Sequence, residues 1–358
     1  MRKIESRGDT MSGIGERLKL ARMKARLSQR NLAEQAGVTA MSISKYENNE
    51  MMPSSDVLFK LAEALNVRME FFLRSSPELE IQPVYRKHSR MGKKAQEAVK
   101  AQIQDWLERY LLVESFYPGD AGFELPAGFP RPVETLVNAE GAAAALREAW
   151  QLGDDPIDIL TELLEEKGIK VGLVEGEDHF DACTFLYDGE TPVIAVNENR
   201  PGDRQRFDLA HELGHIMLHV MEGVDEEKAA HRFAGAFLVP AEAARMELGA
   251  VRRHLDPVEL MMLKEKYGMS MAAWVYRAKD LGILGDSAVD QMWRRFSALG
   301  WRKQEPLELP PEKPRRMDRL VRRLVAEDII SESRAAELMG ERIVLSLDRS
   351  GEAFALHH

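Results

Sequence analysis

The chain has 358 residues, of which 44% are hydrophobic and 30% are charged, and its formal net charge is −10. A length of this order predicts two or three domains, each with its own core. The single cysteine excludes a disulfide framework and a zinc site made of cysteines alone, and it fits the reducing cytoplasm where we expect the protein to act. Because the sequence has neither an apolar run of 18 residues nor an apolar leader, we expect no membrane contact.

The charge is unevenly distributed along the chain. Residues 1–100 contain 19 Lys and Arg against 12 Asp and Glu, a formal charge of +7, so the remaining residues carry −17. A basic segment on an acidic body is typical of a nucleic-acid-binding module joined to a second unit. Solvated charge with no partner would produce the same imbalance, so the motifs must decide between the two.

Residues 11–74 have the pattern of five short helices. Helical spacing and capping residues predict them at Ile14–Ala25, Gln29–Ala36, Ala40–Glu47, a stretch opened by Pro53, and Met69–Leu73. In the first helix we expect Leu18 to face the core and Arg17 to face solvent. Gly37 supplies a tight turn between the second and third helices. Two helices joined in this way form a helix-turn-helix, whose second helix fits the major groove of DNA.

The segment Leu27–Val67 resembles the Cro/CI-like (XRE) family of helix-turn-helix regulators, with Leu32 and Ala33 in the first helix of the motif and Glu47 ending the second. The resemblance implies binding to double-stranded DNA, usually as a homodimer on paired half-sites. The residues that it places at the DNA are Gln29, Thr39, Ala40, Met41, Ser42, Ser44 and Lys45. Apolar Ala40 and Met41 depart from the polar pattern of the family, which favours contact with thymine methyls or weak base readout. The alternative is a helix-turn-helix that contacts only proteins.

The rest of the chain is expected to form three further parts. Residues 75–130 form a linker with a long connector or dimerisation helix at Met91–Phe116; residues 131–250 form an α+β domain; residues 251–358 form a helical region. The expected elements after the connector are helix Asp155–Lys167, strands Lys170–Glu175, Ala182–Tyr187 and Thr191–Val196, and helices Asp203–Met221, Glu226–Leu238, Pro257–Tyr267, Ser270–Leu281, Ser287–Leu299, Met317–Ala326 and Ser331–Leu338. The predicted fold class is mainly α with a small mixed sheet.

His211, Glu212 and His215 form an HExxH motif within one predicted helix. Histidines four residues apart are separated by about 6 Å along the helix axis and about 40° around it, so both imidazoles can reach one ion. Glu212 borders the same face and can lie beside a water on that ion. Zinc would lower the pKa of this water toward ~7, and Glu212 would pass its proton to the leaving amine. Such pentapeptides also arise by chance, but apolar Leu209 and Leu213 on the opposite face favour a metal site.

A third protein ligand would leave the fourth position of the metal open for water or substrate. His219 lies eight residues from His211, about 12 Å along the same helix, and cannot share the ion unless the helix breaks first. Glu227, twelve residues beyond His215, is the better candidate, and it shares a helix face with His231.

This pair of helices resembles the gluzincin-type ImmA/IrrE metallopeptidases, and the likeness covers roughly Pro156–Pro240. The resemblance implies a gluzincin-like α+β peptidase domain that binds Zn²⁺. Its metal ligands would be His211, His215 and Glu227, with Glu212 as the catalytic base. The family pattern has Asn where this chain has His231. We expect His231 to hold a ligand imidazole through a hydrogen bond; the alternative is that it binds the metal and makes the zinc purely structural.

Together the two resemblances imply a cytoplasmic transcriptional regulator that carries a zinc-dependent peptidase. In the ImmA/IrrE family the peptidase typically cleaves a helix-turn-helix repressor during stress responses or mobile-element control. We therefore expect a repressor-like protein substrate, or self-cleavage. Two alternatives remain open: a non-proteolytic transcription factor whose zinc domain senses a ligand or partner, and a toxin–antitoxin-type interaction module. Tyr187 and His179 are candidates for stabilising the oxyanion, and Cys183 is expected to be a small buried side chain.

Overall fold

The computed structural model describes residues 13–74, 79, 81, 91–119, 122–176 and 179–340, so most of the expected linker at 75–90 lies outside the described residues. Its helices are α1 (Ile14–Lys24), α2 (Gln29–Ala36), α3 (Ala40–Glu47), α4 (Ser55–Ala64), α5 (Met69–Leu73), α6 (Lys93–Glu114), α7 (Leu136–Ala149), α8 (Leu160–Glu166), α9 (Gly202–Met217), α10 (Glu226–Leu238), α11 (Ala241–Leu248), α12 (Pro257–Tyr267), α13 (Met271–Asp280), α14 (Asp286–Ala298), α15 (Arg316–Ala326) and α16 (Glu332–Met339). The strands are β1 (Arg131–Val133), β2 (Lys170–Val174), β3 (Ala182–Tyr187), β4 (Thr191–Asn197) and β5 (Leu218–Val220). The predicted fold class is confirmed.

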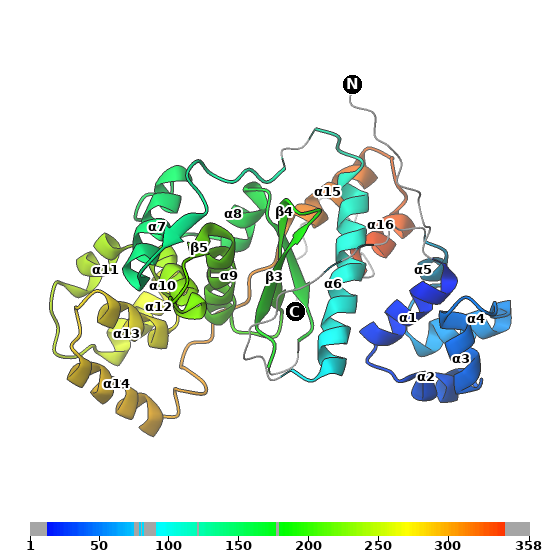
Figure 1. Ribbon diagram of the computed structural model, residues 1–358, viewed down its shortest axis with the longest axis horizontal. Coiled ribbons are helices and arrows are strands. Elements are labelled where there is room, and N and C mark those ends of the chain that lie inside the picture. The colour runs from blue at the N-terminus through cyan, green and yellow to red at the C-terminus, as the bar shows by residue number, and fades with distance from the viewer. Residues whose placement is uncertain are drawn as a thin grey trace, which may run out of the picture.

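Helices α1–α5 form a compact helix-turn-helix unit at one end of the molecule (Figure 1). The side chains of Ser28 and Thr39 cap α2 and α3 by accepting the backbone N–H three residues further on. Gly37 ends α2 with φ +67°, a backbone conformation that favours glycine. Leu32 and Ile43 are fully buried in the core between the helices. Local capping and helical spacing therefore explain why all five elements were predictable.

The three-stranded sheet lies between α6 and α9 in the middle of the molecule (Figure 1). Strand β4 is central, parallel to β2 and antiparallel to β3. Gly172 of β2 lets α6 approach closely, since a Cβ there would lie 2.8 Å from the ring of Trp106. Helix α6 is thus an internal support, and the faces that it buries are covered by α1, β2, α15 and α16 of its own chain.

A cluster of buried charges joins the helix-turn-helix unit to α6. Arg17, which we expected to face solvent, is only 1% exposed, and its Nη1 donates to Glu108 Oε2 at 2.6 Å. Asp105 Oδ1 accepts from Arg74 Nη2 at 2.6 Å, and Asp105 Oδ2 accepts from Lys24 Nζ at 2.8 Å. The expectation for Arg17 was wrong because α6 covers that face of α1, so its cation meets a carboxylate in place of water.

Several elements have different bounds from those expected, because distant segments form hydrogen bonds with their backbone. The helix expected to reach Met221 ends at Met217, since Leu218–Val220 pair with Arg131–Val133 as a parallel two-stranded sheet. The helix expected from Asp155 begins only at Leu160, as Arg206 donates to the carbonyls of the two residues before Ile159. Helices α7 and α11 were not expected at all; the buried face of α7 consists largely of alanines, which gives little hydrophobic contrast.

The segment between α14 and α15 crosses the ends of several helices and ties them to α9. The Glu305 carboxylate accepts both N–H groups at the start of α13, and the Glu312 carboxylate accepts those at the start of α8. Arg206 of α9 forms an ion pair with Glu312, while buried Lys264 lies 3.1 Å from both Asp203 and Glu305. These contacts fix the N-terminal half of α9 and give Glu305 a structural role. Within the described residues, no helix is long and apolar enough to cross a membrane.

We predict that Arg17→Met destabilises the protein by about 3 kcal/mol, because buried Glu108 would lose its nearer guanidinium partner and keep only that of Arg74 at 3.9 Å. The double variant Arg17→Met/Glu108→Leu should lose less stability than the sum of its two single variants. Urea denaturation followed by circular dichroism measures both. Arg30→Met, which alters an exposed arginine of α2, is the control. Additive losses in the double variant would show that the pair contributes nothing.

Candidate metal centre and DNA-binding surface

Close packing of α9 against α10 creates the candidate metal centre. A Cβ at Gly214 would lie 3.2 Å from a ring carbon of Phe233 and 3.3 Å from Cα of Ala230, so the absence of a side chain permits this approach. The carboxylate of Asp225 caps α10 by accepting the N–H of Lys228 at 3.1 Å. Both features place the first turn of α10 beside the C-terminal half of α9.

Three side chains converge at this contact. The Nε2 atoms of His211 and His215 lie 3.1 Å apart. Glu227 Oε2 lies 3.3 Å from His211 Nε2, and Glu227 Oε1 lies 3.8 Å from His215 Nε2. One ligand atom of each residue falls within 4.8 Å of the other two. Two imidazole nitrogens and one carboxylate form a donor set that suits zinc and leaves a fourth position open.

Glu212 follows His211 on α9 and is 2% exposed. Burial first, and the negative charge of Glu212 second, raise the pKa of Cys183 on β3 well above its usual range. Cys183 is therefore a neutral, fully buried thiol.

His231 and His219 lie outside the group of converging ligand atoms. His231 is exposed, and its ring centroid lies 4.5 Å from that of His211 and 5.6 Å from that of Phe207. Its role in orienting a ligand remains a prediction. His219 is exposed on β5, opposite Pro132 of β1, so the helix does break before it, although it does not join the ligands.

Tyr187, a candidate for stabilising the oxyanion, lies elsewhere. It is at the end of β3, four residues and about 13 Å along the strand from Cys183. It lines a cavity with Glu114 and Lys170 on the α6 side of the sheet. His179 is exposed in the loop before β3. Tyr187 therefore lies at a different cavity, and the role of His179 remains a prediction.

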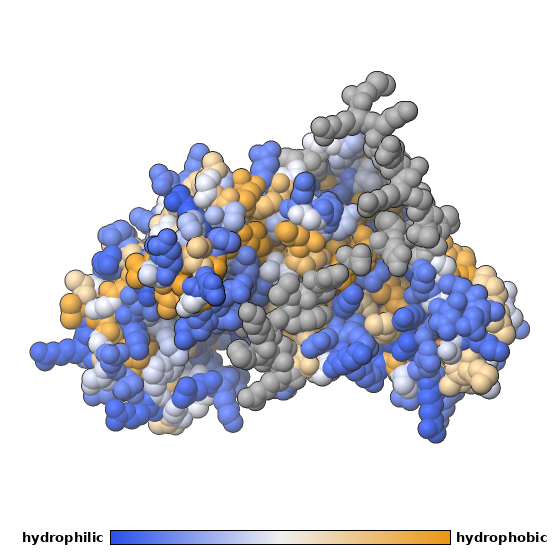
Figure 2. Space-filling model, viewed as in Figure 1, coloured by the Kyte–Doolittle hydropathy of each residue, from blue (hydrophilic) through white to orange (hydrophobic). Residues whose placement is uncertain are grey.

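The candidate DNA-binding surface is formed by α3 and the turn before it. Thr39, Ala40 and Lys45 are exposed, Met41 is 70% exposed, and Ser42 and Ser44 are half-buried. Hydrophilic residues cover much of the helix-turn-helix end in the view of Figure 2. All seven predicted contact residues lie on this unit, and six of them on or beside α3.

The remaining one, Gln29, is held by the ion pair that ends α3. Its amide donates to Glu47 Oε2 at 2.7 Å. The same carboxylate accepts from Arg22 Nε at 2.5 Å and Arg22 Nη2 at 2.9 Å, a bidentate pair. These bonds fix α2 against α3 and place Gln29 at the start of α2.

We predict that Gly214→Ala weakens Zn²⁺ binding about tenfold, because the added methyl must push α10 and Glu227 away from the two histidines. Gly235→Ala in α10 is the matched control, since its Cβ would meet only a flexible carbon of Arg277 at 3.7 Å. Competition with a zinc-binding dye measures both affinities. Equal affinities in the two variants would contradict the proposed role of Gly214.

Comparison with known proteins gives matches for both units. A helix-turn-helix family model matches residues 18–72, and the model of the IrrE N-terminal-like domain matches residues 165–279. The chain is 37% identical over 60 residues to the HTH-type transcriptional regulator ImmR of Bacillus subtilis (strain 168), which is 17% of this chain and 47% of ImmR. It is 33% identical over 64 residues to an uncharacterised HTH-type transcriptional regulator of Sinorhizobium medicae (strain WSM419), which is 18% and 46% of the two chains. The chain thus spans about half the length of the curated relatives it matches.

A solved structure resembles the N-terminal unit. The DNA-binding domain of the P22 c2 repressor is 30% identical and covers 18% of this chain and 84% of its own, with a TM-score of 0.18 that is too low to carry an argument. The two family models, in contrast, include every residue of both candidate sites. This chain therefore combines an XRE-type helix-turn-helix domain at its N-terminus with an IrrE/ImmA-like peptidase domain.

Proposed function

We propose that the protein is a DNA-binding transcriptional regulator whose second domain is a zinc-dependent metallopeptidase that cleaves a repressor-like protein. The observation that carries this proposal is the convergence of His211, His215 and Glu227, with Glu212 buried on the same helix. A separate, exposed recognition helix in the same chain supports the regulatory half.

The residues present fit zinc. Their donor atoms are two imidazole nitrogens and one carboxylate, which zinc prefers, and three protein ligands are typical of catalytic sites. Zinc, when bound, supplies Lewis-acid chemistry that polarises a carbonyl and lowers the pKa of water. His215 and Glu227 are partly exposed, so the fourth coordination position of the metal would be open to solvent, as a peptide substrate requires.

Glu212 would serve as the general base and then as the general acid. Its carboxylate would accept a proton from the attacking water and donate it to the nitrogen of the departing amine. The apolar residues of α9, among them Leu209 and Leu213, are buried in the core beneath the helix and hold it in place. The low exposure of Glu212 strengthens its electrostatic interactions with a bound substrate.

The arrangement of the two domains favours a substrate on another chain. Helix α9 lies on one side of the sheet, and α6 lies on the other, with the helix-turn-helix unit beyond it (Figure 1). The sheet and α6 therefore separate the metal centre from the helix-turn-helix unit of the same chain. A repressor-like protein or a second copy of this chain can approach the open side of α9 without undocking any element.

One observation favours the alternative in which the zinc is structural and the domain senses a ligand. The ring of His231 lies close enough to that of His211 for a rotation of its side chain to bring a nitrogen toward the ligands. A fourth protein ligand would then close the site to substrate. Activity and metal content of site variants distinguish the two functions.

We predict that Glu212→Gln retains about one zinc per chain but abolishes proteolysis, because the amide cannot accept the proton. His211→Ala and Glu227→Ala should lose the zinc itself. Elemental analysis measures the metal, and mass spectrometry of new protein N-termini in cells expressing each variant measures cleavage. Glu222→Gln, an exposed neighbour, is the control. New N-termini that persist in the Glu212→Gln cells would exclude the peptidase mechanism and support the sensor.

We predict that Lys45→Ala weakens DNA binding and reduces the slope of log K against log salt by about one, as expected for one lost phosphate contact. The assay is fluorescence anisotropy with DNA fragments selected by the full chain. Lys60→Ala, which removes an exposed charge from α4, should leave the slope unchanged. Salt-independent binding, or no DNA selection at all, would instead favour a module that contacts only proteins.

A further inference from the structure

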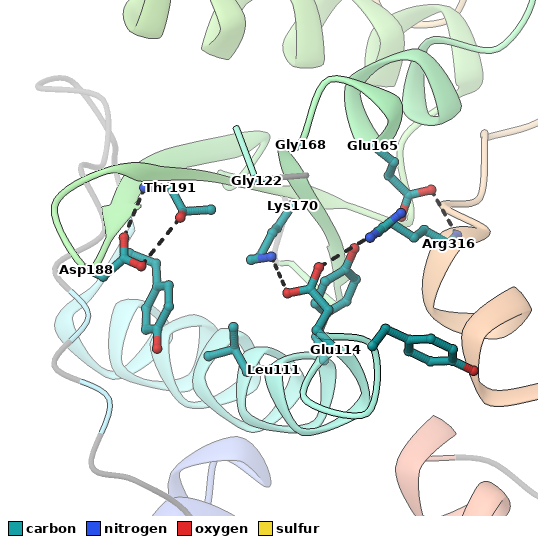
Figure 3. Close-up of a pocket in the computed structure, with 12 residues that line it drawn as sticks. Leu111, Glu114, Gly122, Glu165, Gly168, Lys170, Asp188, Thr191 and Arg316 are labelled. Carbon is teal, nitrogen blue, oxygen red and sulfur yellow. Dashed lines mark hydrogen bonds and ion pairs between the residues drawn. The ribbon is translucent and has the colours of Figure 1, made fainter. Parts of the chain in front are cut away.

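A cavity lies on the opposite side of the sheet from the metal centre. Its volume is about 310 Å³, at the lower end of the range for small-molecule sites. It is formed by the C-terminal part of α6, the end of α8, β2, the turn between β3 and β4, and the start of α15 (Figure 3). None of the candidate metal ligands lines it.

The two cations of this cavity are already engaged with one carboxylate. Lys170 Nζ lies 2.5 Å from Glu114 Oε2 and 4.9 Å from the ring centre of Tyr110. Arg316 Nε lies 3.8 Å from Glu114 Oε1 (Figure 3). Glu114 thus neutralises part of both charges, and the carboxylates of Glu165 and Asp188 bring the total to three acids against two bases.

Among the acids of this cavity, Glu165 has a carboxylate oxygen that can still accept a hydrogen bond from a ligand. Its side chain is buried, with the residue 2% exposed, and its Oε2 accepts the backbone N–H groups of Arg315 and Arg316 at 3.0 Å each. Its Oε1 is also buried and accepts no hydrogen bond from the described part of the chain. Burial raises the pKa of Glu165 to about 7, although the two N–H groups oppose this effect. A buried acceptor without a donor is costly, and a ligand that donates a hydrogen bond removes that cost.

The carboxylate of Asp188 is already used as a hydrogen-bond acceptor within its own turn. Its Oδ1 accepts the N–H groups of Glu190 and Thr191 at 3.2 and 3.0 Å within the turn between β3 and β4. Its charge remains near the cavity. The unpaired acceptor at Glu165 and the negative charge of Asp188 both favour a positively charged donor.

Aromatic rings form much of the remaining wall. Tyr110 and Tyr117 come from α6 and the residues after it, and Tyr187 comes from the end of β3. Cations of the protein already lie over two of these rings, Lys170 over Tyr110 and Arg323 over Tyr117, so these rings offer a ligand apolar contact. With Leu111, which Figure 3 labels, these rings form an apolar and aromatic part of the cavity wall beside the acidic groups.

We propose that this cavity binds a small organic amine, whose ammonium group donates a hydrogen bond to Glu165 Oε1 and whose apolar body lies against the tyrosine rings. The small volume limits the ligand to a compact molecule. Glu165 also holds the first turn of α15, and α15 packs on α6, which carries the DNA-binding unit. A ligand here therefore contacts the segments that support the helix-turn-helix domain.

Isothermal titration calorimetry of the full chain tests the proposal with phenethylamine, agmatine and putrescine as probes. 3-Phenylpropionate, which resembles phenethylamine in shape but carries a negative charge, is the matched control ligand. We expect at least one amine to bind and the carboxylate not to bind. Glu165→Gln should raise the Kd of that amine about 10–100-fold, because the amide lacks the charge that strengthens the hydrogen bond. Glu166→Gln, an exposed neighbour on α8, should leave the Kd unchanged.

A second variant guards against a folding defect in Glu165→Gln. Tyr187→Ala removes one ring from a half-buried position at the end of β3 and should also raise the Kd of the amine. Circular dichroism confirms that both variants are folded. Failure of all three amines to bind, equal binding of 3-phenylpropionate, or unchanged affinity in folded Glu165→Gln would overturn the proposal.

Discussion

The contact between α9 and α10 is the interaction on which the candidate metal centre depends. His211 and His215 come from one helix and Glu227 from the next, so the distance between the helices decides whether the three side chains share an ion. Gly214 and Ala230 permit that distance because neither adds bulk between the backbones. Other contacts fix α9 in the position that this short distance requires. The segment containing Glu312 holds the start of α9, and the pairing of β5 with β1 ends the helix at Met217.

Helix α6 links the two domains through charges that are buried in protein. Taking Arg17 and Glu108 out of water is costly, and their short ion pair offsets that cost only while the domains remain docked. An apolar contact of the same size would be less sensitive to orientation. The pairing of specific cations with Asp105 and Glu108 therefore favours one relative position of the domains, in which α3 points away from α6.

Elements that depend on interactions between neighbouring residues were predictable from the sequence, and elements that depend on distant partners were not. The helices of the N-terminal unit were found because capping side chains and helical spacing act within a few residues. The end of α9, the start of α8 and the burial of Arg17 were not found, since each is decided by a partner far away in the chain. The role of Glu305 was equally hidden, because its carboxylate accepts N–H groups from a helix more than thirty residues before it.

The amino-acid sequence by itself determined the chemistry available to this protein. The four-residue spacing in HExxH places two imidazoles on one helix face, and the turn at Gly37 places α3 across α2. Only the tertiary structure decided how closely the carboxylate of Glu227 approaches those imidazoles, how near His231 lies to them, and which cavity Tyr187 lines. The reason is physical: periodicity constrains neighbours along one helix, while convergence between helices depends on packing, which periodicity does not encode.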